Sequence, residues 1–193
     1  MIQRVSEYFT TEMVKSGVLA REDIEYVQFG LNLILRKLIH ILIFLGTALA
    51  FDKIFEGIIF LIFFSFLRGN CGGYHFSTRN KCYVFSGVIS LLFLLNVTFF
   101  SFSTNICRIA ILLLSIFLII FNNAGYYSID FSEIKIKMLN RRGRILTLLT
   151  AGIYIIFDLL KMEAGYYSIF MSVFVVSMLL FLDIFKKFVG GRY

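Results

Sequence analysis

The hydrophobic positions of this 193-residue chain are gathered in long runs, not in the alternation typical of strands. A helix needs ~17–25 residues to cross the ~30 Å hydrocarbon core of a membrane. The runs therefore predict an all-α, polytopic integral membrane protein with about six transmembrane helices in a single membrane domain, residues 1–193. The six apolar segments lie at about residues 31–51, 54–67, 83–102, 106–121, 145–160 and 166–185.

The distribution of lysine and arginine tests this six-span topology. Segment 54–67 is short and contains Glu56, so it is either a crossing or a re-entrant piece. If all six segments cross, one side of the membrane holds 14 Lys and Arg residues and the other holds two. Basic residues concentrate on the cytoplasmic side. The asymmetry favours crossing, and it predicts that both termini and the 68–82 loop are cytoplasmic.

The first 28 residues predict an amphipathic, cytoplasmic N-terminal segment. Ile2, Val5, Phe9 and Met13 recur at steps of three and four, which places them on one face of a helix. Two interpretations follow: a helix lying on the inner membrane surface, or a cytosolic helix packed on the loops.

Composition narrows the functional classes. The chain is 59% hydrophobic and only 16% charged, unlike a soluble globular domain. Its net charge of +7 fits membrane topology and anionic membrane lipids better than nucleic acid. Cys71, Cys82 and Cys107 form neither a CxxC pair nor an even framework, so we expect no zinc site, no other metal and no disulfide scaffold. No cofactor is expected.

One hexapeptide occurs twice, at residues 124–129 and 164–169, with the sequence Ala-Gly-Tyr-Tyr-Ser-Ile. The flanking residues do not match. We interpret the two tyrosine pairs as interfacial membrane anchors, not as parts of a repeated unit.

The 68–82 loop concentrates the residues that carry chemistry. Its glycines allow a positive φ or close approach to a ligand, and His75 and Cys82 follow them. A cysteine attacks as the thiolate, which neighbouring cations and a helix N-terminus stabilise. With Ser77 or Asn80 as N-cap, Cys82 lies in the first turn of the third span. Because a helix would hold residues seven apart at ~10 Å, the chain must fold back to join His75 with Cys82.

The spacing Arg-x4-Gly-x-His-x6-Cys, in Arg68, Gly73, His75 and Cys82, resembles the accessory gene regulator B (AgrB) family of bacterial quorum-sensing peptidases. The phrase at residues 22–31 and the basic stretch after the fourth span are also similar. The resemblance implies a cell-membrane cysteine endopeptidase, usually a homodimer, with His75 as base and Cys82 as nucleophile. Its substrate would be a small AgrD-like precursor peptide, whose C-terminal tail it removes while the rest closes into a thiolactone or lactone ring.

Further roles follow from this interpretation. Arg68 and the backbone amides at Gly72 and Gly73 are candidates for binding the oxyanion or the substrate. The cytoplasmic stretch 122–144 is either a positive-inside anchor or a site for an acidic peptide tail. Cys71 and Cys107 are interpreted as packing residues. The tail-binding candidates in that stretch are Lys135, Lys137, Arg141 and Arg142.

Two rival classes remain. One is a non-enzymatic membrane transporter or scaffold, in which His75 is only a polar loop residue. The spans, however, hold few ionisable residues and no midplane series of the kind that ion pathways use. The other rival is a membrane transferase that modifies an acyl group or lipid with the same Cys–His pair.

Overall fold

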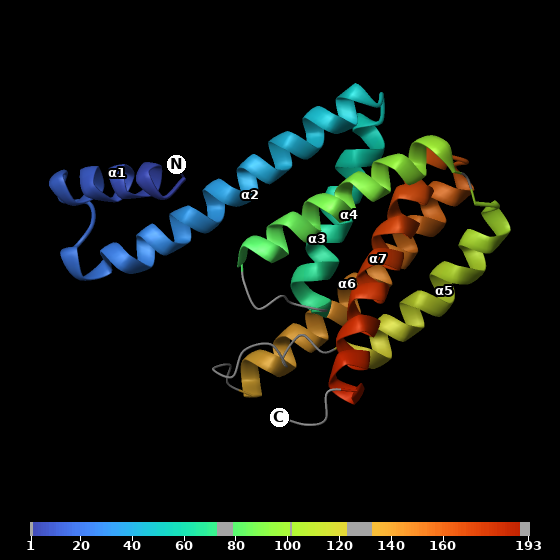
Figure 1. The fold of residues 1–193 in the computed structure, drawn as a ribbon. Coiled ribbons are helices and arrows are strands. Elements are labelled where there is room, and N and C mark those ends of the chain that lie inside the picture. The colour runs from blue at the N-terminus through green and yellow to red at the C-terminus, as the bar shows by residue number, and fades with distance from the viewer. Residues whose placement is uncertain (1, 73–78, 101, 123–132, 190–193) are drawn as a thin grey trace. The chain divides into compact units, whose positions relative to one another are not determined.

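The computed structural model describes residues 2–72, 79–100, 102–122 and 133–189. Within these ranges every regular element is helical, which confirms the predicted all-α class (Figure 1). The elements are α1 (Ile2–Lys15), η1 (Arg21–Asp23), α2 (Ile24–Ala50), α3 (Ile54–Cys71), α4 (Arg79–Phe99), α5 (Thr104–Phe121), α6 (Glu133–Leu159) and α7 (Glu163–Val189).

Four helices of the described chain are long and apolar enough to cross a membrane, and α4 contributes a shorter apolar stretch, Val84–Phe99. The polytopic membrane class is therefore confirmed, while six crossings remain a prediction. The uncertain segment 54–67 lies inside an 18-residue helix, α3, that has the length and composition of a span. The four candidates are Arg21–Ala50, Ile54–Cys71, Thr104–Phe121 and Glu163–Lys186.

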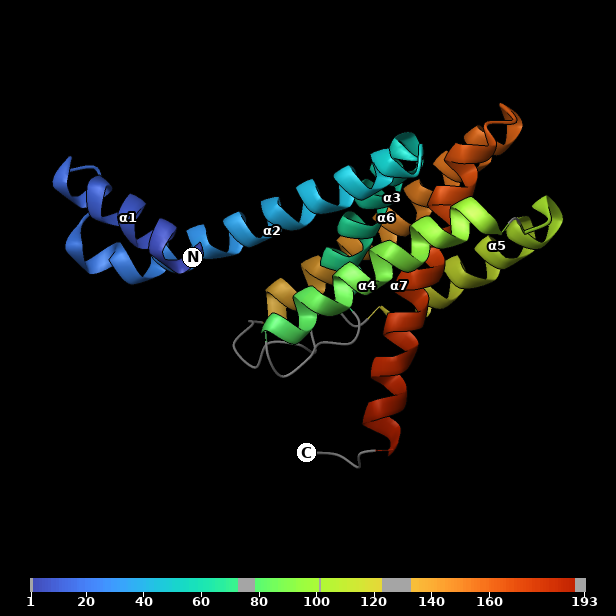
Figure 2. The ribbon, with the colours of Figure 1, turned by 45° about the horizontal axis from the view of Figure 1, so that its top comes forward.

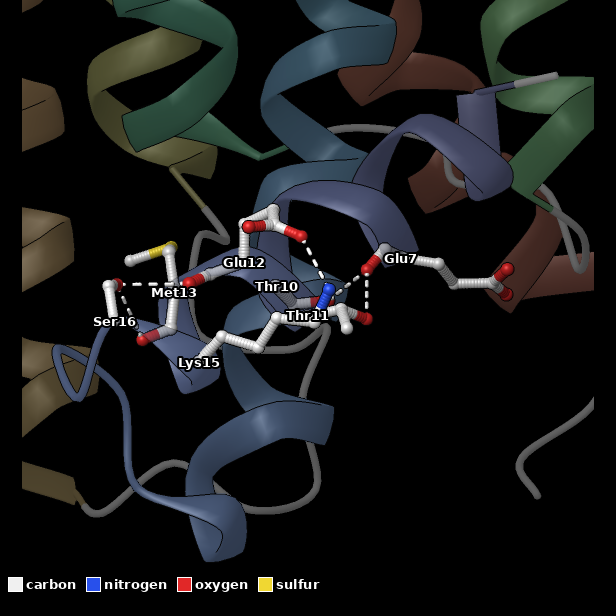
Figure 3. Close-up of polar contacts among 7 residues, drawn as sticks. All are labelled: Glu7, Thr10, Thr11, Glu12, Met13, Lys15 and Ser16. Carbon is white, nitrogen blue, oxygen red and sulfur yellow. Dashed lines mark hydrogen bonds and ion pairs between the residues drawn. The ribbon is translucent and has the colours of Figure 1, made fainter.

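The chain divides into two compact units, and the first runs to Thr47. The hydroxyls of Thr10 and Thr11 in α1, and of Ser16 just after it, donate to carbonyls of the preceding turn (Figure 3). These polar groups need no partner outside the helix. Val5 and Phe9, on the predicted apolar face, are 38% and 51% exposed within this unit, and the choice between a membrane-surface helix and a packed cytosolic helix stays a prediction.

The second unit, from Ala48 onward, is built around α7. This helix packs against α3, α4, α5 and α6, as both ribbon views show (Figures 1 and 2). In its apolar window 61% of the residues are buried, against 33% in α3 and 22% in α5. α7 is therefore the core of the unit, and the other helices present more of their surface to lipid.

Small residues allow the neighbouring helices to approach α7 closely. Ser172 Oγ lies 2.8 Å from the carbonyl of Ser168 and 3.3 Å from that of Phe60 in α3. The ring of Phe157 in α6 lies against Gly165, where an added Cβ would come within 1.9 Å of it. This is the usual way in which helices associate in lipid, where hydrophobicity alone does not draw them together.

The start of α6 differs from the expected one. The apolar segment was expected from about residue 145, but the helix already begins at Glu133. The stretch 133–144 contains no proline and one glycine, Gly143, while its many Lys and Arg residues favour a helix. Nothing in the stretch therefore interrupts the helix. At ~1.5 Å per residue, the 27 residues of α6 extend ~40 Å, longer than the hydrocarbon core is thick. Residues 133–144 therefore form the helical first half of α6, not an irregular loop.

The interpretation of Tyr166 and Tyr167 as lipid-facing anchors is wrong. Both are buried, at 7% and 8% exposure, in the first turns of α7. The hydroxyl of Tyr166 lies 3.2 Å from that of Thr104, and the hydroxyl of Tyr167 donates to the Asn96 side chain. These tyrosines join α7 to α5 and α4. The other copy of the hexapeptide lies outside the described residues.

Candidate active site

The end of α3 leads into the loop predicted to carry the chemistry. The guanidinium of Arg68 donates to the carbonyl of Gly72 over 2.8 Å. Gly72 ends the helix with φ +74° and ψ −145°, a conformation open to glycine and costly for other residues. The prediction that a loop glycine adopts a positive φ is confirmed here. Gly69, by contrast, lies within the helix.

The other end of this loop is the start of α4. Arg79 is the first described residue of the helix, so Cys82 lies in its first described turn, as expected. Asn80 is inside the helix and is therefore not its N-cap. The side chain of Cys82 is outside the described part of the chain. The other loop candidates, Gly73 and His75, also lie outside the described residues, as does Ser77.

Cys71 is enclosed by α6. It is fully buried, with Sγ 3.7 Å from Thr147 Oγ1 and 3.9 Å from the carbonyl of Gly143. Thr147 in turn donates to that same carbonyl over 2.8 Å. Cys107, on α5, is also buried and free. Both thiols are packing groups, as expected.

Gly143, on α6, lies close to the ends of both α3 and α5. A Cβ at this position would lie 2.1 Å from Asn122 Nδ2 and 2.8 Å from the carbonyl oxygen of Asn70. Asn122 Nδ2 also donates to the Asn140 carbonyl over 3.0 Å. The contact joins the last turns of α3 and α5 to the basic half of α6. It therefore fixes where the loop after α3 begins.

A groove follows the basic half of α6. The cavity has a volume of about 540 Å³, and its lining includes Lys137, Arg141 and Arg144. These cations recur at steps of four and three, so they share one helix face. Arg142 is exposed but does not line the groove, and the side chain of Lys135 is not described. Two of the four predicted tail-binding residues, Lys137 and Arg141, thus meet in one groove.

Sequence reasoning missed Arg144, Asn122, Asn140 and Gly143. The helical spacing would have found Arg144 if α6 had been extended through the basic stretch. A glycine inside a helix costs ~1 kcal/mol relative to alanine, so Gly143 among good helix formers was a signal of close approach. Nothing in the sequence pointed to the two asparagines. Among the described residues, no group of His, Cys, Asp and Glu is arranged to hold a metal.

The sequence profile of accessory gene regulator B (AgrB) matches residues 3–186, nearly the whole chain. The chain belongs to the AgrB family. It is 30% identical over 103 residues to "Putative AgrB-like protein 2" of Clostridium perfringens (strain 13 / Type A). That match covers 52% of this chain and 48% of the relative, so the chain spans about half the length of the curated AgrB-like protein. No solved structure matches it.

The close contact at Gly143 gives a test of the site's framework. Gly143→Ala should force the Asn122 amide aside and press on the Asn70 carbonyl, which belongs to the backbone and cannot rotate away. We expect the end of α3 to separate from α6 and expose Cys71. The measurement is the rate at which N-ethylmaleimide labels Cys71 in dodecyl maltoside, read by peptide mass spectrometry, and it should rise at least tenfold.

Gly69→Ala is the matched control. It lies in α3 beside the same contact, and an added Cβ there meets nothing within 4 Å. This variant should leave Cys71 protected and stabilise the helix by up to ~1 kcal/mol. Equal labelling of Cys71 in the two variants would show that the contact at Gly143 does not hold α3 on α6.

Proposed function

We propose that this AgrB-family protein is a membrane cysteine endopeptidase with His75 and Cys82 as its catalytic pair. Its substrate class is a small AgrD-like precursor peptide, from which it removes the C-terminal tail and promotes closure of a thiolactone or lactone ring. The observation that carries the proposal is the family match over residues 3–186, combined with the Arg-x4-Gly-x-His-x6-Cys spacing inside it.

The environments of the three cysteines support Cys82 as the nucleophile. Cys71 is sealed by Thr147 and Gly143, and Cys107 is buried on α5. Neither can reach a peptide carbonyl without separating packed helices. Cys82 lies in the first described turn of α4, where the partial positive charge of a helix N-terminus favours a thiolate.

In the proposed reaction, neutral His75 accepts the proton of the Cys82 thiol, and the thiolate attacks the carbonyl carbon at the processing site. The imidazolium then protonates the departing amine of the tail, which leaves a thioester on Cys82. A thiol or hydroxyl of the peptide attacks this thioester and closes the ring, and the Cys82 thiol is released. Exchange between two thiols keeps a thioester bond that hydrolysis would lose.

The groove on α6 supports a binding site for the C-terminal tail that is cut from the precursor peptide. Arg141 and Arg144 present guanidinium groups, which bind carboxylates in a bidentate manner, and Lys137 adds a third charge on the same face. For Arg68 we propose a role other than the oxyanion binding suggested by the sequence. Its bond to the Gly72 carbonyl supports a positioning role for the start of the loop, with the amides of Gly72 and Gly73 remaining candidates for the oxyanion.

We further propose a homodimer in the bacterial cell membrane, with lipid covering the apolar faces that the second unit leaves exposed. A transporter or scaffold is the main alternative. Iodoacetamide labelling separates the classes: a peptidase should show rapid alkylation at Cys82 and protection by its precursor. A scaffold or transporter should show no such reactivity. An acyl transferase would be protected by an acyl donor and not by peptide.

The first prediction concerns the orientation of the chain. Reporter fusions after Arg79 and after Lys137 should both report the cytoplasm, because 14 basic residues lie on that side in the six-span topology and two on the other. A fusion after Lys161, in the turn between α6 and α7, is the control and should report the outside. A cytoplasmic signal at all three positions would exclude the proposed topology.

The second prediction separates the roles of the catalytic pair. Cys82→Ala should abolish both precursor cleavage and the acyl-enzyme, since the two other thiols, of Cys71 and Cys107, are buried. His75→Ala should lower cleavage severely at pH 7. Raising the pH toward ~8.5, the ordinary pKa of a thiol, should restore part of the activity because hydroxide then supplies the thiolate. Cleavage is followed by mass spectrometry of the released tail.

Cys71→Ser and Cys107→Ser are the controls for this experiment. A serine hydroxyl at position 71 can still donate to the Gly143 carbonyl, so packing should survive and cleavage should stay within a few fold. Normal cleavage by Cys82→Ala, or its complete loss in a correctly folded Cys71→Ser, would remove Cys82 as the nucleophile.

The third prediction tests the α6 groove. Arg141→Glu and Arg144→Glu should each raise KM for a precursor with an acidic tail by about tenfold, because each replaces an attractive charge with a repulsive one. Arg142→Glu makes the same charge change outside the groove. It should alter KM less than threefold. Equal effects at all three positions would indicate general attraction by a basic surface and not a tail site.

A further inference from the structure

A second cavity opens at the opposite end of the second unit from the Cys71–Gly143 contact. Its volume is about 690 Å³, within the range of small-molecule sites. Lys53 and Glu56 line it from the start of α3, whereas Cys71 ends that 18-residue helix, about 27 Å away along its axis. The cavity is therefore separate from the proposed peptidase site.

Aromatic residues from two parts of the chain wall this cavity, and inter-helix contacts hold the tyrosines in place. Phe100 and Phe102 come from the connection between α4 and α5, and Tyr166 and Tyr167 from the start of α7. The tyrosine hydroxyls are bonded to α5 and α4, and the rings of Phe102 and Tyr167 are stacked with centroids 6.3 Å apart. The walls therefore need little reordering when a ligand binds.

The charges that line the cavity favour a cation. Lys53 lies 3.2 Å from the carboxylate of Glu56, which is only 8% exposed, so these two charges neutralise each other. Glu163 is in the first turn of α7 and is exposed, and within the described chain it makes no ion pair. One uncompensated carboxylate thus stands beside a set of aromatic rings.

We propose that this cavity binds a primary ammonium group carried on an aromatic or apolar body. Glu163 attracts the ammonium, and the phenyl and phenol rings receive both the cation and the apolar body by cation–π and hydrophobic contact. An anion is disfavoured because the one lysine in the lining is already paired with Glu56. Two sources offer a primary ammonium together with an apolar body: phosphatidylethanolamine, through its headgroup and acyl chains, and a soluble aromatic amine.

The absence of tryptophan from the chain provides a clean measurement. Tryptamine carries a primary ammonium on an indole ring, so indole emission reports the probe alone. Titrated against the full-length protein in dodecyl maltoside, tryptamine should bind saturably. Indole-3-propionate has the same ring with a carboxylate in place of the ammonium. It should show only the non-saturating partition measured with empty micelles.

Glu163→Gln removes the charge that attracts the ligand while keeping the size of the side chain. Because Glu163 is exposed, the fold should survive, as an unchanged thermal unfolding curve will verify. Tryptamine affinity should fall by about threefold to tenfold, the range expected for a lost charge contact at a partly exposed site. Glu133→Gln removes a first-turn carboxylate from α6 instead and should bind as the wild type.

Equal tryptamine affinity in wild type and Glu163→Gln would overturn the proposal, and so would saturable binding of indole-3-propionate. Binding measured in nanodiscs distinguishes a lipid headgroup from a soluble amine as the natural ligand. If a lipid headgroup occupies the cavity, phosphatidylethanolamine added to phosphatidylglycerol discs should reduce tryptamine binding, and Glu163→Gln should remove that competition. If the natural ligand is a soluble amine, the lipid change should leave binding unaltered. Neither readout requires peptidase activity.

Discussion

The close packing of α3, α4, α5 and α6 on α7 is the interaction on which the rest of the second unit depends. In lipid, apolar side chains gain little by leaving the hydrocarbon for a neighbouring helix, so fit and inter-helix hydrogen bonds must hold the bundle. α7 supplies both in its first turns, where Ser172 approaches the Phe60 carbonyl of α3 and the hydroxyls of Tyr166 and Tyr167 reach α5 and α4. Its neighbours are thereby held in register near the start of α7.

The two ends of these helices carry different polar contacts, about the length of one helix apart. At one end, Gly143 and Asn122 draw α3 and α5 onto the cationic half of α6, beside the ends of the proposed catalytic loop. At the other end, α5 is tied to α6 by a bidentate ion pair between Arg108 and Asp158, at 2.8 and 3.2 Å. The length of the connecting helices keeps the two ends apart.

The sequence predicted the helical membrane class, most apolar segments and the position of Cys82 at the start of α4, because long apolar runs and helix-start signals are local. Prediction from the sequence failed for features that depend on how the helices pack against one another. Nothing local shows that Tyr166 faces a neighbouring helix and not lipid, since a tyrosine near a helix end suits both. Gly143 and Asn122 are far apart in the chain, and only the bundle brings them together. The start of α6 was misplaced because hydropathy marks the apolar part of a helix and is silent on its polar extension.

The basic half of α6 has a consequence for how the chain is inserted during synthesis. Carrying an Arg or Lys through the centre of the bilayer costs about 3 kcal/mol, and this half contains Lys137, Arg141 and Arg144 among its cations. In the proposed six-span topology, this cost keeps the first residues of α6 on the cytoplasmic side. The tight turn at Lys161, with φ +55°, then sends α7 back in the reverse direction. In that topology the basic half of α6 sets the orientation of α7, on which α3, α4, α5 and α6 pack.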